Sequence, residues 1–287
     1  HISHTPYKET LFMLASTLLA LREGLEAALI IGVIIGALYK LGRGRLIPAV
    51  WMGTAAAGLL SFLAALILYR FGMSLEGSFE KVFEGATMLL AAGVLTWMIF
   101  WMKRQSAGMK SALEAEVSAA GEQTPFRSLF FLAFITIIRE GIELSLFLTA
   151  AAFSQGGMQA LLGAALGLTA AAVLGWLLYA SSLRLNLQAF FNITSVLLLI
   201  FAAGLVAHGV HEFNEIGWIP AIIDPIWNMN HILDEKSALG EILKALFGYN
   251  GNPSLTETLA YVSYIAVIAI ALRTMVSPEP KKQSARA

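Results

Sequence analysis

Residues 19–32 read LALREGLEAALIIG, and they place three charged side chains in the middle of a long apolar segment. Residues 136–149 read TIIREGIELSLFLT and repeat the same Arg-Glu-Gly-x-Glu pattern inside a second apolar segment. An ionised side chain at the centre of a bilayer costs roughly 2.5–3.5 kcal/mol on insertion scales, so such residues are rare in membrane spans and functional by default. The two motifs therefore predict a membrane protein with a polar site between its helices.

The composition of the whole chain agrees with this prediction. The chain has 287 residues, of which 57% are hydrophobic and only 13% charged, and its mean hydropathy is +0.72. Soluble domains spend about a quarter of their residues on charge. A formal net charge of zero argues against a nucleic-acid partner, because no basic face is available to neutralise phosphates. The absence of cysteine excludes disulfides, thiolate metal sites and cysteine nucleophiles.

Seven apolar segments approach or exceed the roughly 20 residues that a bilayer-spanning helix requires. They are residues 11–39, 46–69, 82–102, 128–153, 158–181, 189–210 and 257–276. The predicted fold is therefore an all-α polytopic membrane protein with seven transmembrane helices. The connection 103–127 is polar and rich in small residues, and we expect it to be a flexible cytoplasmic loop.

The outer connection 211–256 is too apolar for a solvated loop. Apolar side chains recur in it at helical spacing, which predicts a short amphipathic helix in the outer interface or folded over the bundle. These side chains are Leu239, Ile242, Leu243, Leu246 and Phe247. We expect residues 1–276 to form a single transmembrane domain, followed by a cytoplasmic tail at 277–287. The first residues, HISHTP, lack a methionine and are left out of the fold prediction.

The orientation follows from the lysines and arginines in the connections. Twelve of them lie in the connections on one side of the seven segments and five lie on the other. Connections rich in lysine and arginine stay in the cytoplasm, so the predicted orientation is N-terminus out and C-terminus in. Most acidic residues lie on the outer side, where they would concentrate cations; the same distribution would also arise if acids merely avoid the inner side less strongly.

The two motifs indicate an internal repeat. Spans one to three (residues 10–102) and spans four to six (residues 128–210) each begin with a motif-bearing segment. Because three is odd, the second copy must cross the membrane in the opposite sense, which is the inverted repeat of many transporters, with a site near the midplane where the halves meet. Two glycine pairs, Gly32 with Gly36 and Gly163 with Gly167, have the four-residue spacing that permits close helix packing.

Each motif brings its charges to one helix face. At about 100° per residue, Arg22 and Glu26 lie about 40° apart and Glu23 lies about 100° from Arg22, while Gly24 points away and would let a neighbouring helix approach. The second motif has the same spacing, so Arg139, Glu140 and Glu143 also share one helix face and Gly141 points away. The ion pairs at four-residue spacing offset part of the cost of burial. Four glutamates still face two arginines, which leaves two surplus negative charges.

Surplus carboxylates inside a membrane suit a passing cation. Structural ion pairs that fix helix register would also explain one motif, but they have no use for the second glutamate or for a second motif. We therefore predict Glu23, Glu26, Glu140 and Glu143 as metal ligands, with Arg22 and Arg139 as their charge partners. Oxygen ligands favour hard cations such as ferric iron, manganese, magnesium and calcium, with ferrous iron borderline. A divalent ion would be neutralised and a trivalent ion would leave one positive charge, so the charge balance does not distinguish between the two kinds of ion.

A second group of polar residues lies at the outer ends of spans three and six. Glu84 lies on span three, and His208, His211 and Glu212 lie on span six. Their spacing suits an entrance funnel that passes metal inward, and we count them as candidate metal ligands. A solvated helix end, or histidines bonded to the outer loop, would explain the same pattern.

At both motifs, and in the outer stretches HEFNEIGWIPAIIDPIW and ALFGYNGNPSL, the sequence resembles the oxidase-coupled high-affinity iron permease family of bacteria and fungi. The resemblance covers nearly all of residues 10–276. It implies uptake of ferric iron across the cytoplasmic membrane, with the motif glutamates as iron ligands and no cofactor besides the transported ion. It also implies a multicopper ferroxidase or a periplasmic iron-handling protein as partner. The short N-terminal stretch leads us to expect that partner as a separate chain.

Other functions fit parts of the pattern. Some members of the family handle other metals, so ferrous iron, manganese and lead remain alternative substrates. An intramembrane metal-dependent enzyme would need an activated nucleophile or an open metal site with a general base; no such arrangement stands out, and no catalytic residue is predicted. A membrane anchor subunit would use the motifs only as structural pairs. A homo-oligomer is left open.

Overall fold

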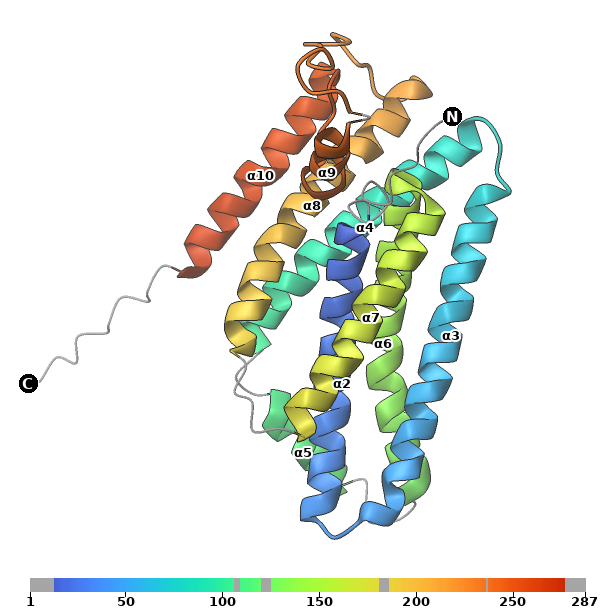
Figure 1. The fold of residues 1–287 in the computed structure, drawn as a ribbon, viewed down its shortest axis with the longest axis vertical. Helices are drawn as coiled ribbons and strands as arrows, with labels where there is room; N and C mark the ends of the chain where they lie inside the picture. The colour runs from blue at the N-terminus through green and yellow to red at the C-terminus, as the bar shows by residue number, and fades with distance from the viewer. Residues whose placement is uncertain (1–12, 106–108, 120–124, 181–185, 236, 277–287) are drawn as a thin grey trace, which may run out of the picture.

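The computed structural model describes residues 13–105, 109–119, 125–180, 186–235 and 237–276. The described part consists of helices, their connections and an irregular outer segment (Figure 1). The predicted tail 277–287 and the start of the first predicted span lie outside the described residues.

All seven predicted spans lie on long helices, which confirms the all-α class. These helices are α2 (Leu14–Lys40), α3 (Ile47–Met73), α4 (Ser78–Gln105), α6 (Pro125–Gln155), α7 (Gly157–Ala180), α8 (Leu187–Glu215) and α10 (Leu255–Val276). Within the described residues, α3, α4, α7, α8 and α10 are long and apolar enough to cross a membrane. Helices α2 and α6 are comparably long, at 27 and 31 residues, but they carry the motif charges.

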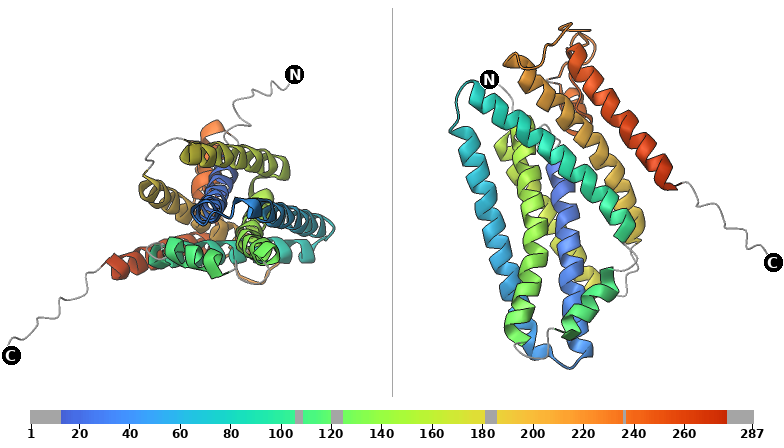
Figure 2. Two further views of the ribbon diagram at one scale, coloured as in Figure 1. Left: turned by 90° about the horizontal axis from the view of Figure 1, so that it is seen from below. Right: turned by 180° about the vertical axis from the view of Figure 1, so that it is seen from behind.

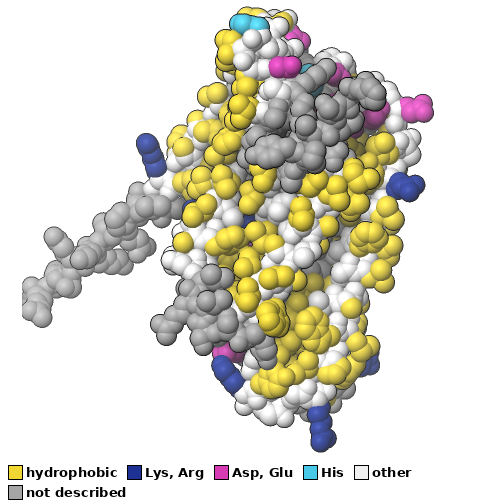
Figure 3. All heavy atoms as spheres, viewed as in Figure 1, with side chains coloured by type: hydrophobic (Ala, Val, Ile, Leu, Met, Phe, Trp, Pro, Cys, Tyr) yellow, Lys and Arg dark blue, Asp and Glu magenta, His cyan; other side chains and the backbone are white. Residues whose placement is uncertain are grey.

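The surface has the character of a membrane protein. Large hydrophobic side chains are exposed along α3, α7 and α10, including Leu59, Ile67, Trp176 and Ile270. Figure 3 shows hydrophobic side chains along most of the visible face, with most of the visible acidic side chains and histidine near the upper end. An apolar surface of this extent would be costly in water, so the protein is a multi-pass membrane protein.

The helices form two sets. Helices α2, α3, α6 and α7 stand roughly upright in Figure 1, whereas α4 and α8 cross them obliquely and α10 lies along α8. The view from behind in Figure 2 shows α4 passing diagonally across α2 and α6. Helices α2 and α6, which carry the two motifs, run in opposite directions (Figure 1).

The two halves exchange their packing partners. Helix α2 of the first half packs mainly on α7 of the second, and α6 of the second half packs mainly on α3 of the first. The motif glycines lie at these contacts. A Cβ added to Gly24 would lie 2.7 Å from the Cβ of Ala171 on α7, and one added to Gly141 would lie 2.6 Å from the Cβ of Ser61 on α3. The prediction that these glycines admit a close neighbouring helix is confirmed.

Close packing at Gly24 can be tested within one helix. Gly24→Ala is expected to lower the stability of the detergent-solubilised protein by about 1–3 kcal/mol, because the added methyl group overpacks the contact with Ala171. The matched control is Gly32→Ala, also on α2, where an added Cβ meets nothing within 4 Å. It should be neutral or stabilising by about 0.5–1 kcal/mol, because glycine costs backbone entropy in a helix. Equal changes in thermal unfolding for both variants would contradict the packing.

The two predicted glycine pairs behave differently. Carbons added at Gly163 and Gly167 would collide with α2, at 2.8 Å from the Cβ atoms of Ser16 and Ala20. Carbons added at Gly32 and Gly36 would meet nothing within 4 Å. These two glycines line a hollow of about 320 Å³ between α2 and α7. Close packing is therefore confirmed for the pair on α7 and wrong for the pair on α2.

The connection 103–127 differs from the predicted flexible loop, because it contains helix α5 (Met109–Ala119). Its sequence MKSALEAEVSA is rich in alanine, glutamate and leucine, which are strong helix formers. Leu113 and Val117, one turn apart, are buried in a core shared with α2, α3 and α6. Lys40 at the end of α2 also pairs with Glu114 at 3.1 Å. Local propensity and this apolar stripe together explain the helix.

The predicted amphipathic helix is present as α9 (Ala238–Phe247). It begins where the Ser237 hydroxyl accepts a hydrogen bond from the Gly240 amide at 3.0 Å, and it ends at Gly248, whose φ of 68° suits a left-handed cap. A Cβ on Gly204 of α8 would lie 2.7 Å from the Cα of Gly248. The outer segment therefore rests on α8 through a glycine–glycine contact.

Candidate metal site

The first motif buries a complete arginine inside the helix bundle. Arg22 is 1% exposed, and its Nη1 lies 3.2 Å from Glu23 Oε1 while its Nη2 lies 3.4 Å from Glu26 Oε1. Both pairs are local to α2; the four-residue spacing predicts the pair with Glu26, whereas the pair with the adjacent Glu23 was not predicted. A guanidinium this deeply buried requires charged partners, and the two glutamates of the motif supply them.

The second motif is similar in pattern but more open. Arg139 Nε donates to Glu143 Oε1 at 3.0 Å, and the guanidinium carbon lies 4.2 Å from the ring centre of Trp101, which is the geometry of a cation–π contact. The Arg139 side chain is 36% exposed. The two arginines are therefore unequal, with the one on α2 sealed in the bundle and the one on α6 partly accessible.

Three motif carboxylates converge between α2 and α6. Glu23, Glu26 and Glu140 each present an oxygen, and these oxygens all lie within 4.8 Å of one another. Metal–oxygen bonds in proteins are about 2.0–2.6 Å long, so an ion between the three groups could contact all of them with little rearrangement. We call these three residues the carboxylate cluster.

The cluster also has unused binding capacity. Among the described residues, Glu23 Oε2, Glu26 Oε1, Glu140 Oε2 and Glu143 Oε2 are buried and make no hydrogen bond. Glu26 Oε1 has only the longer ionic contact with Arg22. A buried carboxylate oxygen without a partner is costly, and a cation would remove that cost. Glu143 contributes to the same charge balance, although its other oxygen is held by Arg139.

Three residues at this site were not predicted from the sequence. Met98 and Met102 of α4 contact Arg22, with Sδ atoms 3.6 Å from Nη1 and 2.9 Å from Nη2, and Trp101 covers Arg139. Their spacing of three and four places them on one face of α4. In an apolar helix such a stripe usually indicates core packing, so only the structure connects it with the motifs.

Two of the candidate ligands at the outer ends of α4 and α8, His211 and Glu212, pair with neighbouring charged residues rather than with each other. His211 Nδ1 lies 3.1 Å from Glu257 Oε1 and His211 Nε2 lies 3.2 Å from Glu215 Oε1. Lys81 Nζ bridges Glu212 and Glu215 at 2.9 and 3.0 Å. Glu257 and Lys81 had not been singled out, and both complete this network. The structure thus links His211 to Glu212 indirectly, through Glu215 and Lys81.

The remaining two outer candidates lie at the edges of this network. His208 Nδ1 lies 3.0 Å from the carbonyl oxygen of Gly204, one turn earlier on α8. Glu84 is half-buried and lies in the electrostatic field of Glu212 and Lys81. A cation arriving here would have to compete with Lys81 for the carboxylates of Glu212 and Glu215.

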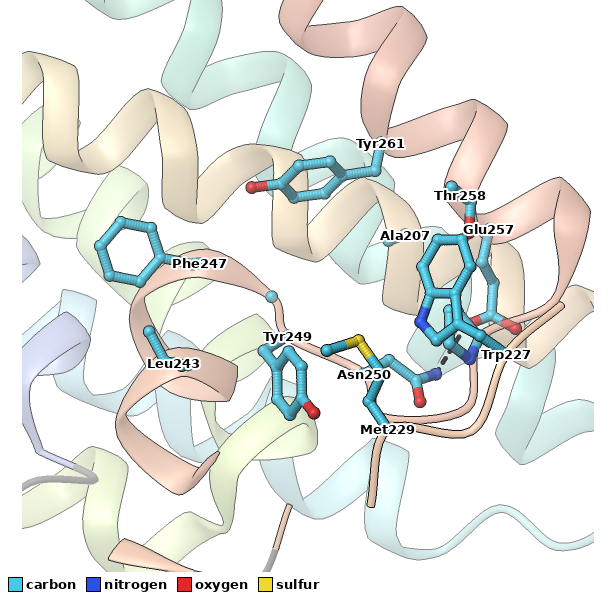
Figure 4. A pocket seen from close by; sticks show the side chains of 12 residues that line it. Ala207, Trp227, Met229, Leu243, Phe247, Tyr249, Asn250, Glu257, Thr258 and Tyr261 are labelled. Atoms are coloured by element: carbon cyan, nitrogen blue, oxygen red, sulfur yellow. Dashed lines mark hydrogen bonds between the residues drawn. The ribbon is translucent and has the colours of Figure 1, made fainter. Parts of the chain in front are cut away.

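A cavity of about 370 Å³ lies beside this network, between α8, α9, α10 and the outer segment (Figure 4). Its wall is largely apolar and aromatic, with Trp227, Tyr249 and Tyr261 among its lining residues. Asn250 Nδ2 donates to Glu257 Oε2 at 2.9 Å at one side of it. Among the described residues, none from the carboxylate cluster lines this cavity.

Comparison with known proteins gives a consistent result. A family model described as "Iron permease FTR1 family" matches residues 13–283. The chain is 36% identical over 264 residues to "Ferrous iron permease EfeU" of Escherichia coli O157:H7, covering 91% of this chain and 96% of that protein. It is 33% identical over 255 residues to "Ferrous iron permease EfeU" of Yersinia pestis, covering 88% and 90%. No solved structure gives a significant match.

Proposed function

This chain belongs to the iron permease FTR1 family, and from that premise we propose that it carries iron inward across the cytoplasmic membrane through the carboxylate cluster. The observation that carries the proposal is the convergence of Glu23, Glu26 and Glu140 within 4.8 Å, with buried oxygens that make no hydrogen bond. A transporter needs a site that holds the ion without enclosing it permanently. Carboxylates drawn from two separate helices meet that need, because a small relative movement of α2 and α6 changes the site.

The membrane architecture that we infer has seven spans, with an inverted repeat and the N-terminus outside. The opposed directions of α2 and α6 and the exchanged packing of α2 on α7 and α6 on α3 support the inverted repeat. The excess of lysine and arginine in the connections on one side supports the orientation. In inverted-repeat transporters the substrate site lies where the halves meet, and the carboxylate cluster lies at the contact between α2 and α6.

Ferrous iron is the species that we propose for the cluster. The charge of –2 left by four motif glutamates and two arginines does not distinguish a divalent from a trivalent ion, so the proposal follows the names of the relatives. The relatives described above carry the name ferrous iron permease. Ferric iron, which the sequence resemblance implies, is the second candidate, and the hard oxygen donors of the cluster favour it.

We propose that the ion arrives at the acidic outer end of the protein. Glu212, Glu215 and Glu257 gather there with His211, and an acidic surface raises the local concentration of cations. A separate extracytoplasmic protein that delivers ferrous iron is the partner that suits this surface, whereas a partner that oxidises iron would go with the second candidate, ferric iron. The partner would act before the ion reaches α2 and α6.

The test is uptake of radioactive iron into proteoliposomes that contain only this protein. With ascorbate present to keep iron ferrous, we expect uptake to exceed that of protein-free vesicles several-fold. Ferric citrate without reductant should give much slower uptake. Faster uptake from ferric citrate would select the second candidate, and no iron uptake under either condition would overturn the proposed function.

A further inference from the structure

Two methionines of α4 line the same guanidinium that pairs with the carboxylate cluster. Met98 is 1% exposed and Met102 is half-buried, and they lie one helical turn apart. Among the described residues, the side-chain partners of Arg22 are Glu23, Glu26 and these two thioethers. A thioether sulfur is only a weak hydrogen-bond acceptor, so hydrogen bonding to Arg22 is a poor reason for two of them.

The terminal nitrogens of Arg22 mark positions where a positive charge meets both oxygen and sulfur. Nη1 lies 3.2 Å from Glu23 Oε1 and 3.6 Å from Met98 Sδ. Nη2 lies 3.4 Å from Glu26 Oε1 and 2.9 Å from Met102 Sδ. Each nitrogen therefore lies between one carboxylate oxygen of the cluster and one thioether sulfur. A cation that displaces the guanidinium from either position has a mixed oxygen and sulfur environment.

We propose that Met98 and Met102 are specificity-determining residues. Their thioether sulfurs would act as metal ligands next to the carboxylate cluster, and would make the site favour ferrous iron over harder divalent cations. The inference rests on the proposed function. Carboxylates alone accept magnesium, calcium and manganese readily, whereas thioether donors favour softer ions and add nothing for the hard ones. A site with oxygen donors on α2 and α6 and sulfur donors on α4 discriminates by ligand type rather than by size.

Apolar packing alone does not explain the placement of these sulfurs. Leucine fills nearly the same volume as methionine in a buried site, and α4 already uses Leu95 and Ile99 in the surrounding core. Methionine differs in the polarisable sulfur, and in both residues the sulfur atom is directed at Arg22. The other arginine, Arg139, faces the ring of Trp101 instead, so the sulfur side belongs to the α2 half of the site.

The test compares the double variant Met98→Leu/Met102→Leu with the wild type and with Met88→Leu. Met88 is the matched control, because it lies on the same helix, is also 1% exposed and packs in the apolar core. Ferrous uptake into proteoliposomes is measured with ascorbate and rising concentrations of manganese or magnesium. In the double variant we expect the concentration of manganese that halves iron uptake to fall about tenfold, as for other residues that support a metal site. Met88→Leu should match the wild type.

A second measurement keeps the inference testable if the double variant transports poorly. Iron K-edge X-ray absorption on the purified, ferrous-loaded protein should detect sulfur scattering in the wild type and in Met88→Leu. This scattering should weaken in the single variant Met102→Leu, which keeps Met98, and should be lost in the double variant. Unchanged competition by manganese, or oxygen-only scattering in the wild type, would overturn the role of the methionines. Absence of iron transport by the wild type would instead overturn the proposed function, so the two failures are distinguishable.

Discussion

Replacing Glu140 by glutamine is expected to lower the initial rate of ferrous iron uptake about 100-fold, since losing a buried charge interaction of about 3 kcal/mol corresponds to that factor. Among the three residues of the carboxylate cluster, Glu140 gives the clearest test. Its carboxylate lies among those of Glu23 and Glu26, and no ion pair of Glu140 is found among the described residues. The substitution therefore removes a candidate ligand and its charge without leaving a bonded arginine unpaired.

The control for this experiment is Glu114→Gln on α5, which removes an exposed carboxylate paired with Lys40 and should leave uptake unchanged. Folded yield is followed by size-exclusion chromatography in detergent, so that a loss of transport is not confused with a loss of protein. The single glutamine variants of Glu23, Glu26 and Glu143 complete the set. Normal uptake in all four motif variants would show that the cluster is not the transport site.

The second large effect concerns stability and separates the two arginines. Arg22→Gln is expected to destabilise the protein by about 3–5 kcal/mol, because it leaves the buried carboxylates of Glu23 and Glu26 without their positive partner. Arg139→Gln should cost less, because it leaves one buried carboxylate, that of Glu143, without its partner instead of two, and because the Arg139 side chain is itself 36% exposed. The measurement is thermal unfolding of both variants in the same detergent.

The cause of the Arg22 effect can be isolated with the double variant Arg22→Gln/Glu26→Gln. Removing one unpaired carboxylate together with the arginine should recover part of the lost stability, as expected for two groups in direct contact. Equal destabilisation by Arg22→Gln and Arg139→Gln would contradict the difference in burial. A double variant no more stable than Arg22→Gln would show that the loss comes from packing rather than from charge.

Much of the fold follows from the sequence, because apolar length and motif charges act locally. Seven long helices lie where the apolar segments predict them, and the four-residue spacing of Arg22 and Glu26 is enough to predict their ion pair. The proximity of Glu140 to that group was inferred only through the repeat. Helix α5 was missed because the polar composition of 103–127 concealed a two-residue apolar stripe, Leu113 and Val117.

The missing parts of the site depend on contacts between distant segments. Met98 and Met102 lie in a helix whose apolar pattern is ordinary, and only its oblique crossing brings their sulfurs to Arg22. In the same way, Glu257 meets His211 because α10 packs on α8. Neither contact has a signature in spacing, since the tilt of one helix over another depends on all the side chains between them.

The exchange of packing partners between the halves has a consequence for how the chain is made. Helix α2 carries three charged residues and leaves the ribosome well before α7, yet the surface that fits Gly24 belongs to α7. Helix α3 likewise lacks its main packing partner until α6 has been synthesised. The first half therefore cannot complete these contacts during its own insertion, and α2 lacks its main packing partner until α7, the fifth long helix of the described part, has emerged. We therefore expect the contacts around the carboxylate cluster to form late in synthesis, after both α6 and α7 have been made.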